Sequence, residues 1–333
     1  MLIVDSYSIA VVMLFITMLC WGSWANTQKL ATQKWPFQLF YWDYTLGVLL
    51  LSLVLGLTLG STGAEGRGFL EDLAQANGEA LRSAFIGGVV FNIANLLLVA
   101  AIDLAGMAVA FPIGIGLALV LGVIVNYVAV PVGDPFLLFG GVALVTIAII
   151  LDALAYRQKA GGVSATTKGI LISLVAGTLM GFFFRFVAAA TIQDFANPAP
   201  GLMTPFGSVF VFSVGIFLSN FLWNTIFMYR PISGEKVSYG QYFRQGNARL
   251  HLVGILGGVI WCVGMSFSML ASEQAGFAIS YGLGQGATMI AAIWGVFIWK
   301  EFAGTSSKTK RLIATMFVFF SIGLALIILA RVN

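Results

Sequence analysis

Two ionisable side chains lie inside apolar stretches of the sequence, where a charge is costly and usually has a role. Asp43 lies in an aromatic-rich apolar run. Its carboxyl is a candidate carrier of a coupling proton, because removal from water disfavours the charged form. Alternatively, it is a structural carboxylate paired with Lys29 or Asn26. Arg185 could bind a substrate oxygen, or its long side chain could extend to the membrane surface.

Amide and aromatic side chains gather in other apolar stretches. Asn92 and Asn95 are three residues apart, as are Gln285 and Thr288, so each pair shares roughly one face of a helix. Amides and aromatic rings suit an uncharged solute that exchanges hydrogen bonds and stacks on a ring. Each side chain could instead join two helices. The candidate substrate-binding residues are Trp24, Asn92, Asn95, Arg185, Trp261, Tyr281, Gln285 and Thr288.

The sequence carries no pattern typical of an enzyme, a cofactor site or a metal site. His251 is the single histidine, and Cys20 and Cys262 both lie in apolar runs, which gives a disulfide or metal site no support. The stretch Gly282–Gly286 has no lysine and no strand before it, so it does not match a nucleotide-binding loop. We expect no catalytic activity, no cofactor and no nucleic-acid partner.

Membrane helices must position these residues. The chain has 333 residues, of which 59% are hydrophobic and 9% charged, whereas soluble domains have about 45–50% apolar and about 25% charged residues. A helix of about 20 apolar residues crosses the hydrocarbon core. Hydropathy predicts ten such spans, at about residues 8–28, 37–60, 83–103, 105–127, 134–155, 168–190, 205–229, 251–272, 276–298 and 309–331.

Basic residues favour one side of the predicted topology. One set of loops holds thirteen of them, namely Lys29, Lys34, Arg157, Lys159, Lys168, Arg230, Lys236, Arg244, Arg249, Lys300, Lys308, Lys310 and Arg311. The other side holds Arg67, Arg82 and Arg331. Because basic loops remain in the cytoplasm, we expect both termini outside, in a bacterial cytoplasmic membrane. The net charge of +4 follows from the same bias.

The sequence also repeats internally. Ala105–Gly116 aligns without gaps on Ala275–Gly286, shifted by 170 positions, and Gly87–Val89 aligns on Gly257–Val259 with the same shift. The third and fourth predicted spans therefore correspond to the eighth and ninth. Chance similarity between glycine-rich helices is the alternative, although one shift shared by two consecutive spans argues against it.

The repeat divides the chain into two five-span halves, residues 1–160 and 161–333. Because five is odd, the second half crosses the membrane in the opposite direction. We therefore expect an all-α integral membrane protein of ten transmembrane helices, arranged as two inverted five-helix repeats. Such repeats, with a binding site between them, recur among secondary transporters.

Short motifs over nearly the whole chain resemble the drug/metabolite transporter superfamily. They are Gly22-Ser-Trp24, Gly87-Gly88, Gly114-Ile-Gly116, Lys168-Gly169 and Trp299-Lys-Glu-Phe302. Within the superfamily, the patterns are similar to the bacterial sugar-uptake permeases, including the rhamnose–proton symporter, and to the plant ureide permeases. The long central loop of the plant proteins is missing, because Arg157 to Thr167 is a short connector.

The resemblance implies proton-coupled uptake by alternating access, with a site between spans 3, 4, 8 and 9 that spans 1 and 6 complete. We therefore expect a secondary active transporter for a small, polar, uncharged solute. A sugar is our first expectation. A ureide or nucleobase-like heterocycle is the second, and export of drugs or metabolites is a further alternative on the same fold.

Overall fold

The computed structural model of the chain describes residues 1–31, 35–159 and 166–332. Within these ranges the regular elements are helices, together with one isolated β-bridge between Thr191 and Met203. With π-helical segments written η, the helices are α1 (Tyr7–Ser23), α2 (Asn26–Leu30), α3 (Phe37–Leu57), α4 (Phe69–Gln75), α5 (Gly78–Ala105), α6 (Met107–Ala110), η1 (Phe111–Gly116), α7 (Leu117–Ala129), α8 (Pro135–Lys159), α9 (Thr167–Ala190), α10 (Pro205–Tyr229), α11 (Tyr239–Gln245), α12 (Ala248–Ala275), α13 (Phe277–Gly284), α14 (Ala287–Ile293), η2 (Trp294–Ile298) and α15 (Ser307–Val332).

In the described part of the chain, nine helical segments are long and apolar enough to cross a membrane, so the protein is a multi-pass membrane protein. They correspond to nine of the ten predicted spans. The first predicted span corresponds to the shorter helix α1, which has 17 residues and ends at Ser23. A turn at Trp24 and Ala25 then separates α1 from α2, so the run at about 8–28 is divided between two helices.

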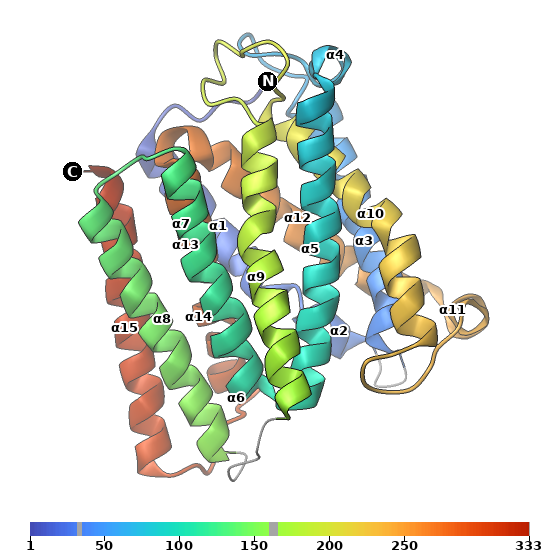
Figure 1. Ribbon diagram of the computed structural model, residues 1–333, viewed down its shortest axis with the longest axis vertical. Helices are drawn as coiled ribbons and strands as arrows, with labels where there is room; N and C mark the ends of the chain where they lie inside the picture. The colour runs from blue at the N-terminus through green and yellow to red at the C-terminus, as the bar shows by residue number, and fades with distance from the viewer. Residues whose placement is uncertain (32–34, 160–165, 333) are drawn as a thin grey trace.

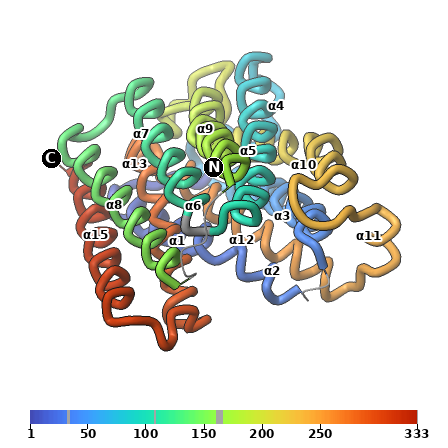
Figure 2. Tube along the Cα trace, turned by 60° about the horizontal axis from the view of Figure 1, so that its bottom comes forward, coloured from blue at the N-terminus to red at the C-terminus, as the bar shows by residue number. Residues whose placement is uncertain are grey.

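The helices form one bundle whose two ends differ. The N-terminus, the C-terminal end of α15 and α4 lie toward the upper end in Figure 1, and α2 and α11 lie at the lower end. Helix α8 packs along α15 at one edge, and α3 packs with α10 and α12 toward the other (Figures 1 and 2). Helices α5 and α9 pack together between these edges.

Glycines bring two pairs of helices into backbone contact. A Cβ atom at Gly258 of α12 would collide with the carbonyl oxygen of Tyr44 in α3, and one at Gly88 of α5 would collide with that of Phe212 in α10. Small residues allow such close approach in membrane bundles, where packing rather than the hydrophobic effect joins the helices. The repeated Gly-Gly motif thus sets two equivalent crossings, α12 on α3 and α5 on α10.

Helix bounds follow the 170-residue shift found in the sequence. Helices α4 and α11 each have 7 residues, α5 and α12 each have 28, and the bounds within each pair differ by 170. Asn77 and Asn247 cap the N-termini of the long helices with their side-chain oxygens. Both long helices end at a glycine with positive φ, Gly106 at 74° and Gly276 at 81°, a conformation that favours glycine.

The fourth and ninth predicted spans are interrupted at corresponding places. Phe111–Gly116, which contains Pro112, forms the π-helix η1. Its counterpart, Tyr281–Gly286, contains the end of α13 at Gly284 and the turn at Gln285 and Gly286 that precedes α14. Proline and π-helical turns break the regular hydrogen-bond ladder, so both spans have irregular backbone near the middle of the bundle.

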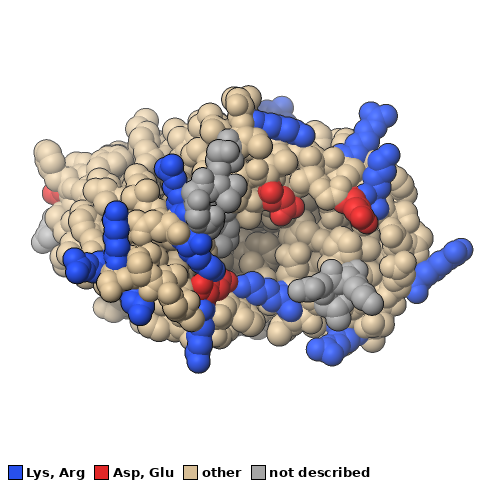
Figure 3. All heavy atoms as spheres, turned by 90° about the horizontal axis from the view of Figure 1, so that it is seen from below, with Lys and Arg blue, Asp and Glu red and all other residues tan. Residues whose placement is uncertain are grey.

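Basic side chains gather at the lower end of the bundle. Seen from below, Lys and Arg side chains are spread over this end, and both basic and acidic side chains lie around a hollow in the protein surface (Figure 3). Lys34, which the sequence assigns to this side, and part of the connector between Arg157 and Thr167 lie outside the described residues.

Candidate functional site

A cavity of about 1000 Å³ opens at the lower end of the bundle (Figure 3). Its walls come mainly from α1, α2, α5, η1, α9, α12 and α14. Lys29, Asp103 and Glu235 line the cavity near the lower end, whereas Phe91 and Trp261 line it near the middle of their helices. The volume is at the upper end of the range of about 300–1,000 Å³ for small-molecule sites. The cavity therefore has room for a small solute.

Aromatic rings form the inner part of the cavity. The ring of Trp261 lies 4.5 Å from that of Phe91 and stacks on Trp21 at 5.8 Å, measured between ring centroids. Trp24, another residue of the wall, packs against the buried Tyr44 at 4.7 Å. Such packed rings offer a rigid, flat surface on which a planar solute can stack.

Two amides in the wall have unused hydrogen-bonding groups. Asn95 donates from Nδ2 to the hydroxyl of Tyr41 at 3.2 Å, and its carbonyl oxygen makes no hydrogen bond within the described residues. The side-chain amide of Gln285, at the turn between α13 and α14, makes none within those residues either. Thr288 lies one turn farther and donates to the backbone carbonyl of Gln285 at 2.9 Å. Both amides and Thr288 line the cavity, so amide groups are free to meet a solute.

Two of the predicted site residues lie behind the cavity wall. Asn92 is fully buried and donates to the Ile216 carbonyl at 3.2 Å and to the Ser219 hydroxyl at 2.9 Å, so it joins α5 to α10. Tyr281 is also fully buried, and its hydroxyl lies within hydrogen-bonding distance of the carbonyl oxygens of Ala118 and Met180. Both side chains therefore hold helices together.

Arg185 also lies apart from the cavity lining. It lies on α9, five residues from the C-terminal end of that helix, and is partly exposed. Its guanidinium makes no hydrogen bond or ion pair within the described residues. Of the eight residues predicted to bind substrate, the structure thus gathers five in the wall, which are Trp24, Asn95, Trp261, Gln285 and Thr288.

Asp43 lies in α3 behind the wall, and its partners differ from the two we expected. The hydroxyl of Tyr242 donates to Oδ1 at 2.5 Å, and Nδ1 of His251 lies 3.0 Å from Oδ1 and 2.9 Å from Oδ2. Lys29 instead forms an ion pair with Glu301 at 3.3 Å. Asn26 instead bonds to Ser23 and Trp299. The prediction of Lys29 or Asn26 as the partner is wrong because α11 folds against α3 and α12.

Sequence reasoning missed Tyr242, and it gave His251 no part in the site. The internal repeat offers a signal for Tyr242 alone. A shift of 170 places the polar segment of α11 on that of α4, and Tyr242 on Asp72. Burial and the neighbouring Asp43 carboxylate raise the pKa of Tyr242, which keeps its hydroxyl a hydrogen-bond donor.

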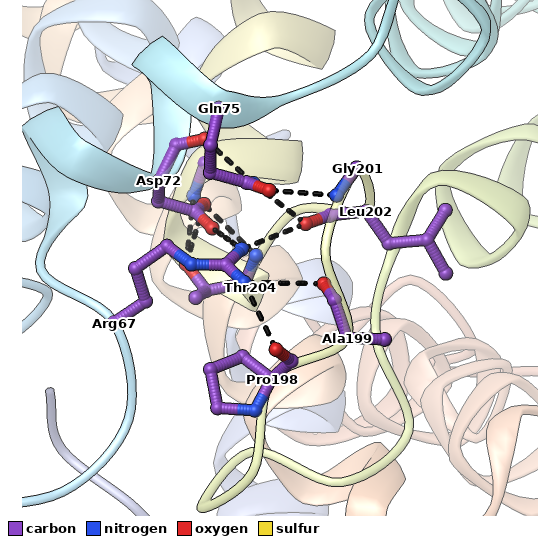
Figure 4. A network of polar contacts seen from close by, with 9 residues as sticks. Arg67, Asp72, Gln75, Pro198, Ala199, Gly201, Leu202 and Thr204 are labelled. Carbon is purple, nitrogen blue, oxygen red and sulfur yellow. Dashed lines mark hydrogen bonds and ion pairs between the residues drawn. The ribbon is translucent and has the colours of Figure 1, made fainter.

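Polar contacts close the opposite end of the bundle (Figure 4). Asp72 of α4 is fully buried, pairs with Arg67 at 3.0 Å, and accepts hydrogen bonds from the backbone N–H and the hydroxyl of Thr204, both at 2.9 Å. Gln75 accepts from the backbone N–H of Gly201 at 2.7 Å and donates to Leu202. The guanidinium of Arg67 also donates to the carbonyl oxygens of Pro198, Ala199 and Leu202.

We call this network the upper closure: Arg67, Asp72, Gln75 and Thr204 with the loop 198–202. It ties the segment before α5 to the loop between α9 and α10. Burial raises the pKa of the Asp72 carboxyl, while the hydrogen bonds from Thr204 and Arg67 oppose that rise. The cavity thus opens at the lower end while buried polar contacts bind the upper end together.

Comparison with known proteins shows which family the sequence matches. A family model described as "Ureide permease" matches residues 40–167 and 161–330. The chain is 25% identical to "Ureide permease 1" of Arabidopsis thaliana, over 98% of this chain and 98% of that protein. It is also 25% identical to "Glucose uptake protein GlcU" of Bacillus subtilis (strain 168), over 74% of this chain and 75% of that protein.

A solved structure gives support for the fold alone. It superposes with a TM-score of 0.61 at 16% identity, and the match covers 97% of this chain and 98% of the other. The comparisons thus support the ureide permease part of the resemblance seen in the sequence. They give no particular support to the rhamnose–proton symporter.

Proposed function

The chain belongs to the ureide permease family and is a transporter rather than an enzyme, and we propose that it takes up a small, flat, uncharged solute with urea or amide groups. The sequence alone favoured a sugar over this class. The family match and the full-length plant relatives favour the ureide or nucleobase-like heterocycle instead. A ureide or nucleobase-like heterocycle is therefore the first candidate and a sugar the second.

The observation that carries this proposal is the pairing of free amides with ring faces in one cavity. A urea or amide group has a donor and an acceptor side by side, and a side-chain amide complements both. The carbonyl of Asn95 and the amide of Gln285 supply these groups, and Trp24 and Trp261 supply aromatic faces. Tryptophan faces stack well on a flat heterocycle.

A sugar remains a second candidate because of one relative. The similarity to the glucose uptake protein covers three quarters of both chains. Sugar hydroxyls can also bond to amides and lie against tryptophan rings. The two kinds of solute need different contacts from the protein, because a sugar has no planar ring to stack and no urea group.

The proposed mechanism is alternating access by two inverted five-helix repeats, residues 1–160 and 161–333. The shared helix bounds, the equivalent glycine crossings and the two interrupted spans support this division. Inverted repeats commonly hold the substrate between the halves, and the cavity wall draws on both halves here. The structure is then the state that is open at the lower end.

The membrane orientation follows from charge. Because basic loops remain in the cytoplasm, the lower end faces the cytoplasm and both termini lie outside, in a bacterial cytoplasmic membrane. The observed cavity is then open inward. Concentrating an uncharged solute requires a co-transported ion, and we propose a proton. Export of drugs or metabolites on the same fold is the alternative direction.

Exchange in proteoliposomes tests the substrate class. Purified protein would be reconstituted, loaded with unlabelled solute and given external labelled hydantoin, uracil or glucose. We expect exchange of the first or second and none of glucose. Exchange of glucose alone would support the sugar candidate, and exchange of none would contradict the proposed class.

A melting-temperature screen with the same three compounds gives an independent readout. A ligand that binds only the folded protein raises its apparent stability by mass action. We expect hydantoin or uracil to raise the melting temperature and glucose to leave it unchanged. Asn95→Leu serves as the matched control, because the variant should lose the shift while it keeps the fold.

A further inference from the structure

We propose that Asp43 and His251 together bind the proton that this transporter carries, an inference that rests on the proposed function. The two side chains come from different halves of the chain, since Asp43 is in α3 and His251 is in α12. They lie behind the cavity wall. The proposal therefore separates the proton site from the substrate site.

The side chains of Asp43 and His251 are in direct contact. His251 Nδ1 is within 3.0 Å of both carboxylate oxygens of Asp43, so one proton can be shared between the two groups. The side chain of Asp43 is only 2% exposed, whereas that of His251 is 30% exposed. The imidazole thus connects a sealed carboxylate to the lower end, where a proton can leave for the cytoplasm.

In the part of the chain that the structure describes, the Asp43 carboxyl has no ion-pair partner other than His251. Within the described residues, the ionisable side chains that contact the Asp43 carboxyl are Tyr242 from α11 and His251 from α12. Helix α10 also packs on α3, and there it brings the uncharged Met228 against Trp42. The ion pairs of Lys29 and Arg67 are made with other carboxylates. With one proton bound the pair is neutral, and without it the pair carries one negative charge.

The pair lies where helices from the two halves of the chain meet. At Gly254 of α12, a Cβ atom would lie against the Cβ of Asp43, at the crossing where α12 packs on α3. A buried net charge is costly in a membrane protein. Proton binding removes that charge from the interface between the halves, so we infer that the protonated pair lowers the cost of the change in access.

The ring of Trp35 lies between the pair and the cavity. Trp35 is buried and lines the cavity, and its ring lies edge-on to His251 at 5.7 Å and 6.0 Å from Tyr242, between centroids. Its indole N–H has no hydrogen-bond partner within the described residues. A shift of His251 on protonation would therefore reach the cavity wall through one ring.

The test compares two activities of the same proteoliposomes. Exchange of labelled hydantoin or uracil needs no net proton movement, whereas accumulation under an imposed pH gradient does. One pH unit supports about tenfold accumulation at one proton per solute. We expect Asp43→Asn to keep exchange and lose this accumulation. We expect His251→Gln to keep exchange and to accumulate less, with a changed dependence on internal pH.

Asp152→Asn is the matched control. Like Asp43, Asp152 is a carboxylic acid within a long apolar helix, here α8. It does not line the cavity. This variant should accumulate solute like the unaltered protein. Full accumulation by Asp43→Asn, or loss of accumulation in Asp152→Asn alone, would overturn the proposal. If Asp43→Asn does not fold, full accumulation with an unchanged pH profile in His251→Gln overturns it.

The unaltered protein separates the two levels of inference. If it exchanges neither compound, the proposed substrate class fails first. If it exchanges solute but does not accumulate it under a pH gradient, the proposal of a proton site is wrong and the proposed transport of the solute is still supported.

Discussion

Helices α4 and α11 occupy equivalent positions at opposite ends of the bundle, each just before a 28-residue helix, but they make different contacts. At the upper end, Asp72 of α4 binds Arg67 and Thr204 and closes the end with buried bonds. At the lower end, Tyr242 of α11 binds Asp43 of α3, and a cavity stays open beside it. The two short helices therefore hold equivalent places in the chain and differ in the polar contacts that they make.

Each end of the bundle buries a carboxylate, but the two carboxylates have different counter-charges. Asp72 has an arginine as its counter-charge and a bridging role between loops. Asp43 has only a histidine, whose charge depends on protonation. Arg67 is always charged, so its ion pair with Asp72 suits a permanent contact in the upper closure. A titratable partner such as His251 suits a site that binds and releases a proton.

A topology reporter gives the largest, all-or-none effect. A reporter that is active only outside the cytoplasm, fused to the C-terminus, should be active, because the basic loops lie at the other end. An inactive reporter on an intact, inserted protein would show that the upper end faces the cytoplasm. The observed cavity would then be open to the outside.

Arg67→Ala should release the upper closure. It leaves the Asp72 carboxylate buried without its cation, a change that costs about 3–5 kcal/mol for a buried pair. Ser208 is buried one turn after Thr204 in α10. The readout is Ser208→Cys in a chain that also carries Cys20→Ala and Cys262→Ala. We expect an impermeant thiol reagent to label this cysteine from outside only when Arg67 is replaced. Equal labelling with Arg67 intact would show that the network does not close the end.

Asn95 and Asn92 separate binding from packing on one helix. Asn95→Leu should weaken solute binding by about 1–3 kcal/mol, because a polar group of the solute loses its partner, with little change in melting temperature. Asn92→Leu should lower the melting temperature and leave the affinity nearly unchanged, because it removes the bonds to α10. Binding titrations and melts of both variants would decide, and the reverse pattern would place the site elsewhere. Gln285→Leu should behave like Asn95→Leu.

External pH should have the smallest effect of these changes, and it should act on the upper closure through protonation of Asp72. Burial raises the pKa of its carboxyl in the closed end, whereas an opened end would return it to an ordinary value. The closed state then binds the proton more tightly, so lowering the pH favours closure and raising it weakens closure. Because the thiolate is the reactive form, labelling of any cysteine slows at low pH, so each rate is divided by the rate for free cysteine at the same pH. This corrected labelling of Ser208→Cys in the Arg67→Ala protein should fall as external pH falls. Adding Asp72→Asn should remove the remaining dependence, and corrected labelling that rises at low pH would contradict the sign.

Much of this architecture could be predicted from the sequence, because length and hydropathy largely determine where helices cross a membrane. The repeat at a shift of 170 also anticipated the matching bounds of α5 and α12. The choice among polar residues could not be made in the same way. Asn92 and Asn95 lie on roughly one helix face, yet one faces α10 and the other the cavity, and spacing alone does not reveal the neighbouring helix.

The contacts of Asp43 were the least predictable. Its partners are distant in sequence, and they meet only because the short helix α11 folds against α3 and α12. A seven-residue helix leaves a weak signal in hydropathy. The role of α11 becomes clear only by comparison with α4. There Asp72, which is equivalent to Tyr242, lies in the upper closure.

The most direct test is the side from which the cavity can be reached. Ala291 lines the cavity, and Ala291→Cys in a chain with Cys20→Ala and Cys262→Ala places one thiol there. In the absence of solute, an impermeant thiol reagent should label it from the cytoplasmic side of inverted membrane vesicles. It should not label it from the outer side of right-side-out vesicles while Arg67 and Asp72 are intact. Labelling from the outer side alone would contradict an inward-open cavity beneath a closed outer end.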